Sequence, residues 1–327
     1  MVDLYKKRYW FFILSASILI LGLVFYFAKG FVLDIQFEGG TVIEMKANKD
    51  TFTEANTQKI TGDIAELVQK TVSKPAQVQK STAFDATNSN SSYDVIKISI
   101  GSQDTLSNAE LSSVKSAVIK ELKLDAATAL INEESVQPFI GKEIMQNGMK
   151  AVLISFILII LYVWWRFKAM SQGPSAGVFA IAGVLHDVLI MVSVYLIFSL
   201  PLNESFIAAI LTVIGYSMND TIIIYDRIRE NSRLLKRVPL PELVNSSIMQ
   251  TLNRSINTVV TALIAITTVF VFAKVYGIES IAQFSFPLII GIATGCYSSI
   301  FIASPLWVMW KESQKKSNAS PKKPLKA

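Results

Sequence analysis

The sequence has almost none of the residues from which disulfide scaffolds, metal centres and acid–base enzymes are built. Its 327 residues include one cysteine, Cys296, and one histidine, His186. A lone cysteine excludes an internal disulfide, and one residue of each kind does not make the Cys and His sets that bind zinc. No phosphate-binding loop and no nucleophile–base set is visible either. We therefore expect no metal, no cofactor and no enzymatic activity.

Charged residues are scarce as well. They make up 17% of the chain, while hydrophobic residues make up 51%. Soluble proteins contain roughly 25% charged residues, and about 20 apolar residues in a row are enough to cross the hydrocarbon core of a bilayer. The sequence predicts six transmembrane helices, at residues 9–28, 148–165, 177–200, 206–225, 254–273 and 284–308.

The distribution of lysine and arginine predicts how these helices are oriented. Residues 1–8, 166–176, 226–257 and 311–327 fall on one side and together hold 17 Lys and Arg. Such basic segments stay in the cytoplasm. We expect a cytoplasmic N-terminus (1–8), a membrane region at 148–310 and a basic cytoplasmic tail (311–327). Residues 29–147 are then an extracytoplasmic domain.

Two alternatives concern the ends of the chain. Residues 9–28 also fit a cleaved signal peptide, but the apolar core is longer than usual and no A-x-A cleavage site follows. The tail ending in SPKKPLKA also fits a nucleic-acid contact. Cations after a last span are more typical of contacts with anionic lipids. We expect membrane lipids, and no nucleic acid, as partners of the tail.

The segment between the first two spans has its own pattern. Its predicted elements are a strand at 31–47 bent at Gly39-Gly40, a helix opening at Thr53-Glu54, a hairpin of 77–84 and 93–100 with its turn at 87–92, a helix at 106–122, and a weaker strand at 127–140. This β-α-β-β-α-β order is the ferredoxin-like pattern of an α+β domain. We interpret it as a binding or mechanical module without a catalytic site.

The fourth span contains ionisable residues at membrane depth, which mark functional sites by default. At 100° per residue, one face holds Thr212, Gly215, Tyr216, Asn219 and Asp220. The opposite face is apolar, with Leu211, Ile214, Met218 and Ile222. We expect the polar face to point into the helix bundle.

The fifth span carries a second polar stripe. Arg254 shares a face with Thr251, Asn257, Thr258, Thr261 and Thr268. The fourth span runs inward and the fifth outward, so Arg254 and Asp220 reach comparable depth and are expected to pair. Separating Asp220 from that cation favours its protonated form through desolvation, which allows an ion relay. A static bridge between two helices is the alternative.

The third and sixth spans add further candidates. His186-Asp187 lies near the middle of the third span, and His186 is either a titrating group or a hydrogen-bonded interior residue. Gly291 and Gly295 form a G-x-x-x-G that permits close approach of helices. Ser217 is expected to support the polar seam.

Five segments match a known family. They are FEGGT (37–41), VLHDVLI (184–190), GYSMNDTIIIYDRIREN (215–231), TLNRSINTVVT (251–261) and FSFPLIIGIATGCYSSIFIASPL (284–306). The chain resembles the SecF family, the smaller membrane subunit of the bacterial SecD–SecF accessory complex. Where that family has a Gly-Ile-Asp-Phe run, this chain has Asp34-Ile35-Gln36-Phe37.

The resemblance implies a role and a set of partners. SecF is one six-helix half of an architecture shared with efflux pumps of the resistance-nodulation-division (RND) superfamily. With SecD it uses the proton, or sodium, motive force to draw secretory polypeptides from the SecYEG channel in the inner membrane. The family's coupling carboxylate falls on Asp220 and its arginine on Arg254, with Asn219 and Asp187 in adjoining motifs. The alternatives are half of a small-molecule or lipid transporter, and a scaffold that transports nothing.

Overall fold

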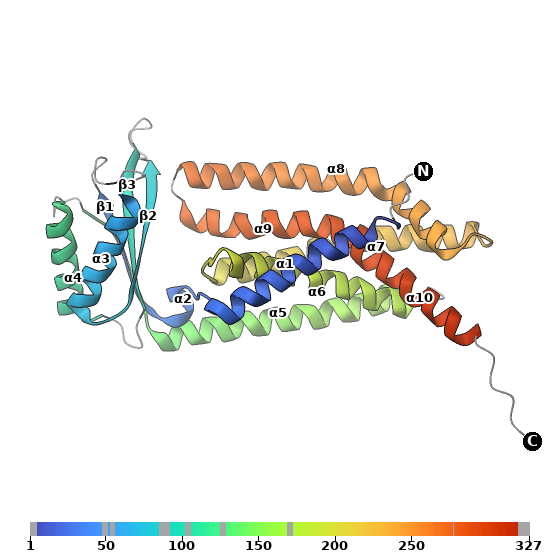
Figure 1. The fold of residues 1–327 in the computed structure, drawn as a ribbon, viewed down its shortest axis with the longest axis horizontal. Coiled ribbons are helices and arrows are strands. Elements are labelled where there is room, and N and C mark those ends of the chain that lie inside the picture. The colour runs from blue at the N-terminus through green and yellow to red at the C-terminus, as the bar shows by residue number, and fades with distance from the viewer. Residues whose placement is uncertain are drawn as a thin grey trace, which may run out of the picture.

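The computed structural model describes residues 5–47, 52, 56–84, 92–101, 106–124, 129–168, 173–276 and 278–319. Long helices lie side by side in one bundle, and a small sheet flanked by two helices sits at one end of it (Figure 1). The start of the first helix and the end of the last lie toward the other end of the bundle (Figure 1).

Six helices in the described part of the chain are long and apolar enough to cross a membrane, which confirms the predicted number. They are α1 (Arg8–Lys29), α5 (Pro138–Phe167), α6 (Gly173–Ile197), α7 (Glu204–Leu234), α8 (Leu240–Val275) and α9 (Glu279–Ser298), the last continued by η1 (Ser299–Ala303) and α10 (Ser304–Ala319). Half or more of the membrane-length segments of α6, α7 and the α9–α10 helix is buried, against 6% to 11% in α1, α5 and α8. α6, α7 and the α9–α10 helix therefore form the centre of the bundle.

Two helices extend well beyond their apolar stretches. α5 begins at Pro138 and α8 at Leu240, ten or more residues before the predicted spans. The first turns of α8 pack on the last turns of α7, where Asn231 Nδ2 donates to Ser247 Oγ and to Gln250 Oε1, each at 2.8 Å. A hydropathy pattern does not detect such turns, because they contain buried polar side chains that form hydrogen bonds with one another.

The sheet contains β1 (Gly40–Ala47), β2 (Ala76–Phe84), β3 (Ser92–Gly101) and β4 (Leu130–Val136) in the order β2-β3-β1-β4, with every neighbouring pair antiparallel. Its core packs against α3 (Thr57–Val72) and α4 (Asn108–Leu122), through residues such as Ile43, Ile98, Ile64 and Val114. The predicted helix start at Thr53-Glu54, the turn at 87–91, residue 127 and the tail from 320 lie outside the described residues.

The predicted strand at 31–47 is wrong in its first half. Residues 35–38 form a short helix, α2 (Ile35–Glu38), because the Asp34 side chain accepts a hydrogen bond from the amide of Gln36 and caps that turn. Gly39 and Gly40 then have φ angles of 78° and 143°, which residues with a Cβ rarely adopt. The strand starts only after this bend.

Small residues set the closest contacts of the bundle. A Cβ on Gly291 of α9 would lie 2.3 Å from Val213 Cγ2 of α7, and one on Gly295 would lie 3.1 Å from Ser217 Cβ. By contrast, a Cβ on Gly215 would meet no atom of the described chain within 4 Å. Gly291 and Gly295 therefore allow α9 to pack tightly on α7, whereas Gly215 lies on an open face.

The last membrane helix contains one π-helical turn, η1. Pro305 lacks the amide hydrogen that would bond the carbonyl of Phe301, and proline also clashes with that carbonyl in a regular helix. The Ser304 hydroxyl instead donates to the carbonyl of Ser299 at 2.8 Å. Single π turns of this kind often occur at functional sites.

Candidate functional site

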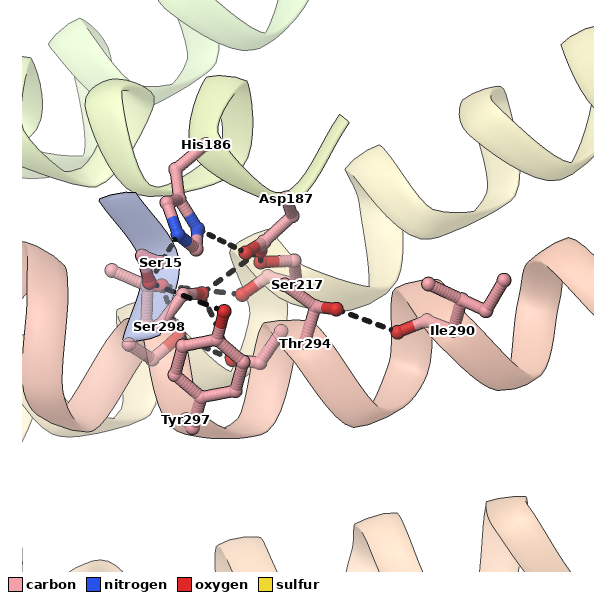
Figure 2. Close-up of polar contacts among 11 residues, drawn as sticks. Ser15, His186, Asp187, Ser217, Ile290, Thr294, Tyr297 and Ser298 are labelled. Atoms are coloured by element: carbon pink, nitrogen blue, oxygen red, sulfur yellow. Dashed lines mark hydrogen bonds and ion pairs between the residues drawn. The ribbon is translucent and has the colours of Figure 1, made fainter. Parts of the chain in front are cut away.

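A buried carboxylate lies where α6, α7 and α9 meet. Asp187 is fully buried, and its Oδ2 accepts hydrogen bonds from Ser217 of α7 at 2.5 Å and from Ser298 of α9 at 2.9 Å. Its Oδ1 lies 3.0 Å from Nδ1 of His186 (Figure 2). Charge-assisted bonds of this kind are what allow a carboxylate to remain in an interior. Both oxygens of Asp187 therefore have partners.

His186 connects this carboxylate to the first helix. Its Nε2 lies 2.9 Å from the hydroxyl of Ser15 on α1, and that hydroxyl lies 3.3 Å from the Tyr297 hydroxyl on α9. The four groups form a continuous line from Tyr297 to Asp187 (Figure 2). The sequence does not predict Ser15, Tyr297 and Ser298 as site residues, because uncharged hydroxyls occur in many apolar helices and do not stand out as an ionisable group does.

The second buried carboxylate has a different environment. Asp220 of α7 is buried, and its Oδ1 accepts a hydrogen bond from Ser255 of α8 at 2.5 Å. Its Oδ2 is also buried and has no hydrogen-bond partner. An unsatisfied buried oxygen of this kind costs about 1 to 3 kcal/mol, and more when it is charged. Of the two carboxyl groups Asp187 and Asp220, Asp220 is thus the one with an open position.

The predicted pair of Asp220 and Arg254 does not form in this structure. No ion pair joins them among the described residues, although Arg254 is near enough to act on Asp220 electrostatically. α8 turns the next residue, Ser255, toward α7, and the Arg254 side chain is exposed. It lines a recess of about 650 Å³ between the last turns of α7 and the first half of α8, beside Arg227 and Gln250.

The expected direction of the polar face of α7 holds for the buried Asp220 but not for most of that face within this chain. Ile214 and Met218 of the apolar face are buried in the bundle, whereas Thr212, Gly215 and Asn219 are exposed in this chain. Helical periodicity identifies residues that share a face, but it does not say which face the chain itself covers.

The polar stripe of α8 is exposed beside the polar face of α7. Asn257, Thr258 and Thr261 lie on the surface of this chain, and the half-buried Tyr216 of α7 donates a hydrogen bond to the carbonyl of Thr258 at 3.4 Å. Exposed polar residues on two adjacent helices form one strip at membrane depth. The geometry therefore combines a carboxyl with an open position, a nearby arginine and an uncovered polar strip.

This arrangement suits the binding and release of an ion more than covalent chemistry. No group of three or more His, Cys, Asp or Glu that fits a metal ion occurs among the residues the structure describes. Asp187 and Asp220 are held mainly by serine hydroxyls, which donate to a carboxylate and accept from a carboxylic acid. Such a site tolerates both charge states.

The comparisons with known proteins agree on a family. Residues 115–313 match the model of the family "Protein export membrane protein SecD/SecF, C-terminal". The chain is 33% identical to the protein translocase subunit SecF of Alicyclobacillus acidocaldarius, over 98% of this chain and 96% of that protein. It is also 33% identical to the protein translocase subunit SecDF of Bacillus subtilis, over 97% of this chain and 39% of that longer protein.

Solved structures give the same result. The crystal structure of SecDF from Thermus thermophilus matches 95% of this chain with a TM-score of 0.74 and 30% identity, and this chain spans 39% of it. SecDF in its super-membrane-facing form matches with a TM-score of 0.65 and 32% identity. The fold is therefore SecDF-like, and the relatives are subunits for protein translocation. The chain belongs to the SecD/SecF family of protein export membrane proteins, as a multi-pass membrane protein.

Proposed function

We propose that this chain is the SecF-type subunit of a SecD–SecF complex that uses the proton or sodium motive force to assist SecYEG-dependent export. It lies in a bacterial inner membrane with both termini in the cytoplasm. Residues 29–147 form a ferredoxin-like extracytoplasmic module that acts on the emerging secretory polypeptide. The observation that carries this proposal is the buried Oδ2 of Asp220, which has no hydrogen-bond partner.

Asp220 is the coupling carboxyl in this account. A proton on Oδ2 removes the cost of an unpaired charge in the interior. The arrangement in which Ser255 bonds Asp220 at 2.5 Å therefore suits the protonated state of Asp220. A small movement of α8 then brings Arg254 to the carboxylate and releases the proton. One charge crossing 100 mV supplies about 2.3 kcal/mol, which biases such a two-state movement modestly. Asp187 and Asn219 belong to the same ion-coupling set.

A SecD-like subunit is the partner that covers the exposed polar strip of α7 and α8. Asn219, Asn257 and Thr261 are too polar to face lipid at this depth. The relatives called SecDF are longer than this chain, which spans 39% of the Bacillus subtilis protein. A second membrane half in the same assembly places its own polar groups against the strip, and Arg254 then lies at the boundary between the halves.

Two of the connections between the bundle and the sheet are able to transmit movement of the bundle. α2 packs against the start of α5, and residues 32–34 pair with the loop before α7, where the Asp34 amide donates to the carbonyl of Leu202 at 2.9 Å. Displaced helices therefore carry the sheet with them. This suits a mechanical module, and it is the basis for preferring export over half of an RND transporter for small molecules or lipids.

The test is translocation of a reporter protein into inverted membrane vesicles, with and without an imposed proton gradient. Asp220→Asn keeps the shape of the side chain and removes its ionisation. We expect the gradient-dependent part of export to be lost, while Glu230→Gln, an exposed acid at the inner end of α7, behaves as wild type. Full gradient-dependent export by Asp220→Asn would leave only a scaffold role.

A further inference from the structure

The hydrogen-bonded line from Tyr297 to Asp187 passes through Ser15 of α1, the helix that leads into the sheet. We infer that Tyr297, Ser15, His186 and Asp187 form a proton relay that sets how α1 docks on the bundle, with His186 as the positioning residue. The inference rests on the proposed function only in that an ion-driven cycle supplies the proton. It assigns to Asp187 a task that differs from that of Asp220.

α1 is attached to the bundle by few interior contacts. Only Ser15 and Gly22 are buried among its residues, and they lie seven positions apart, on one face of the helix. A Cβ on Gly22 would lie 2.5 Å from Ser193 Cβ of α6, so α1 and α6 touch there. The other interior contact is the hydrogen bond between Ser15 and His186 at 2.9 Å. The buried contacts of α1 are thus one close backbone approach and one polar bond, and the half-buried Phe11 adds ring stacking on Phe301 and Tyr297.

The uptake of one proton reverses the direction of the hydrogen bond between Ser15 and His186. When the pair holds one proton, Nδ1–H of His186 donates to Asp187, and Nε2 accepts from the Ser15 hydroxyl. A second proton goes either to the imidazole or to the Asp187 oxygen that faces it. In both cases Nε2 becomes a donor, because Nδ1 either keeps its hydrogen or accepts one from the carboxyl. Ser15 must then accept from His186 and turn its own hydrogen toward Tyr297.

In the part of the chain that the structure describes, the neighbouring helices bring hydroxyl groups and no charged side chain into hydrogen-bond contact with His186 or Asp187. α6 contributes Asp187, α1 contributes only the hydroxyl of Ser15, and α7 contributes the hydroxyl of Ser217 on the far side of the carboxylate. α9 contributes the half-buried Tyr297, whose ring packs edge-on against the imidazole at 5.8 Å. Within the described residues, no lysine or arginine makes an ion pair with this group. The state of the relay therefore depends on the pair itself and on protons that arrive through Tyr297.

The relay lies beside the π turn of the last membrane helix. Phe11 of α1 stacks on Phe301 of the π turn η1, with ring centroids 3.7 Å apart, and Ser298 immediately before η1 bonds Asp187. Histidine as a residue type changes charge between about pH 5 and pH 8. Reversal of the Ser15 bond changes the strength and the geometry of the polar attachment of α1, and residues 32–34 pass the displacement of α1 to the sheet.

The experiment measures distances between two spin labels in the full chain, reconstituted with its partner, at about pH 8 and about pH 5. The labels replace Ile20 on α1 and Ile264 on α8, which are both exposed, in a Cys296→Ser background. We expect two distance populations whose ratio changes at least threefold between the two pH values. His186→Gln keeps a polar side chain that does not titrate, and the ratio should stay constant.

A matched pair of serines on α1 distinguishes loss of the relay from a general loss of folding. Ser15→Ala removes the acceptor and should abolish most of the pH response, whereas Ser17→Ala, whose exposed hydroxyl bonds only the Ile13 carbonyl, should keep it. The relay is refuted if the wild-type ratio does not change with pH, if His186→Gln responds like wild type, or if Ser15→Ala and Ser17→Ala respond alike.

The same labelled chain separates this inference from the proposed function. Asp220→Asn should lose gradient-dependent export and keep the movement of α1 with pH. If Asp220→Asn exports normally and α1 still moves, the proposed function fails and the relay stands. If export is lost and α1 does not respond to pH even with His186 present, the relay fails and the proposed function stands.

Discussion

A glycine in the centre of the bundle gives the sharpest test of the packing. A Cβ on Gly291 would lie 2.3 Å and 2.8 Å from the two methyl carbons of Val213 and 2.9 Å from Met191 Sδ. Valine in a helix has essentially one χ1 rotamer, so Val213 is unable to rotate away and α9 must shift from α7. Overpacking of this kind costs about 1 to 3 kcal/mol.

Gly215 provides the matched control for Gly291→Ala. Gly215 lies in a neighbouring central helix with open space around its Cα, and alanine gains roughly 1 kcal/mol over glycine in any helix interior. This gain cancels when the two variants are compared. Gly291→Ala should therefore be less stable than Gly215→Ala by about 1 to 3 kcal/mol, measured by unfolding in mixed detergent micelles followed by circular dichroism.

A second substitution tests whether the loss comes from the predicted clash. Val213→Ala removes both methyl carbons that meet the new Cβ, so the double variant Gly291→Ala/Val213→Ala should lose less stability than the sum of the two single variants. Equal stability of Gly291→Ala and Gly215→Ala, or additive losses in the double variant, would refute the proposed packing of α9 on α7.

Two further predictions concern single hydrogen bonds. Ser298→Ala removes a donor from the fully buried Asp187 and should lower the free energy of unfolding by about 1 to 3 kcal/mol, whereas the exposed Ser113→Ala should leave it unchanged in the same detergent assay. Bonds from the backbone and side chain of Ser107 lower the Glu110 pKa below its ordinary 4.5, so their stabilisation is present above that pH and is lost as pH falls through the lowered pKa. Ser107→Ala should raise the Glu110 pKa, and acid titration followed by NMR of labelled glutamate would contradict this if the pKa stays where it is.

Hydropathy was sufficient to predict the six membrane helices, because almost every turn of a helix that crosses the bilayer must be apolar. The helix lengths were harder, since the first turns of α8 are held by the buried bonds of Asn231 and carry no apolar signal. The strand expected at 31–47 fails for a local reason. One side-chain cap at Asp34 makes a helical turn more stable than an extended chain, although the residues alternate as in a strand.

The candidate site was only partly predictable. Membrane-depth charges identified Asp187 and Asp220, because an ionisable group among apolar residues stands out in any sequence. Their partners depend on which residue of a neighbouring helix points inward, and an error of one position exchanges Arg254 for Ser255. The polar face of α7 was placed inside because the chain was treated alone, whereas the structure leaves most of it uncovered.

Infrared difference spectroscopy tests the central claim most directly, in the reconstituted complex as the pH on one side of the membrane is lowered. The account predicts a carboxylic acid band that grows on acidification, is smaller in Asp220→Asn because the contribution of Asp220 is lost, and keeps its wild-type size in Glu230→Gln. A band that remains in Asp220→Asn with its wild-type size would mean that Asp220 takes up no proton. It would contradict the proposed coupling.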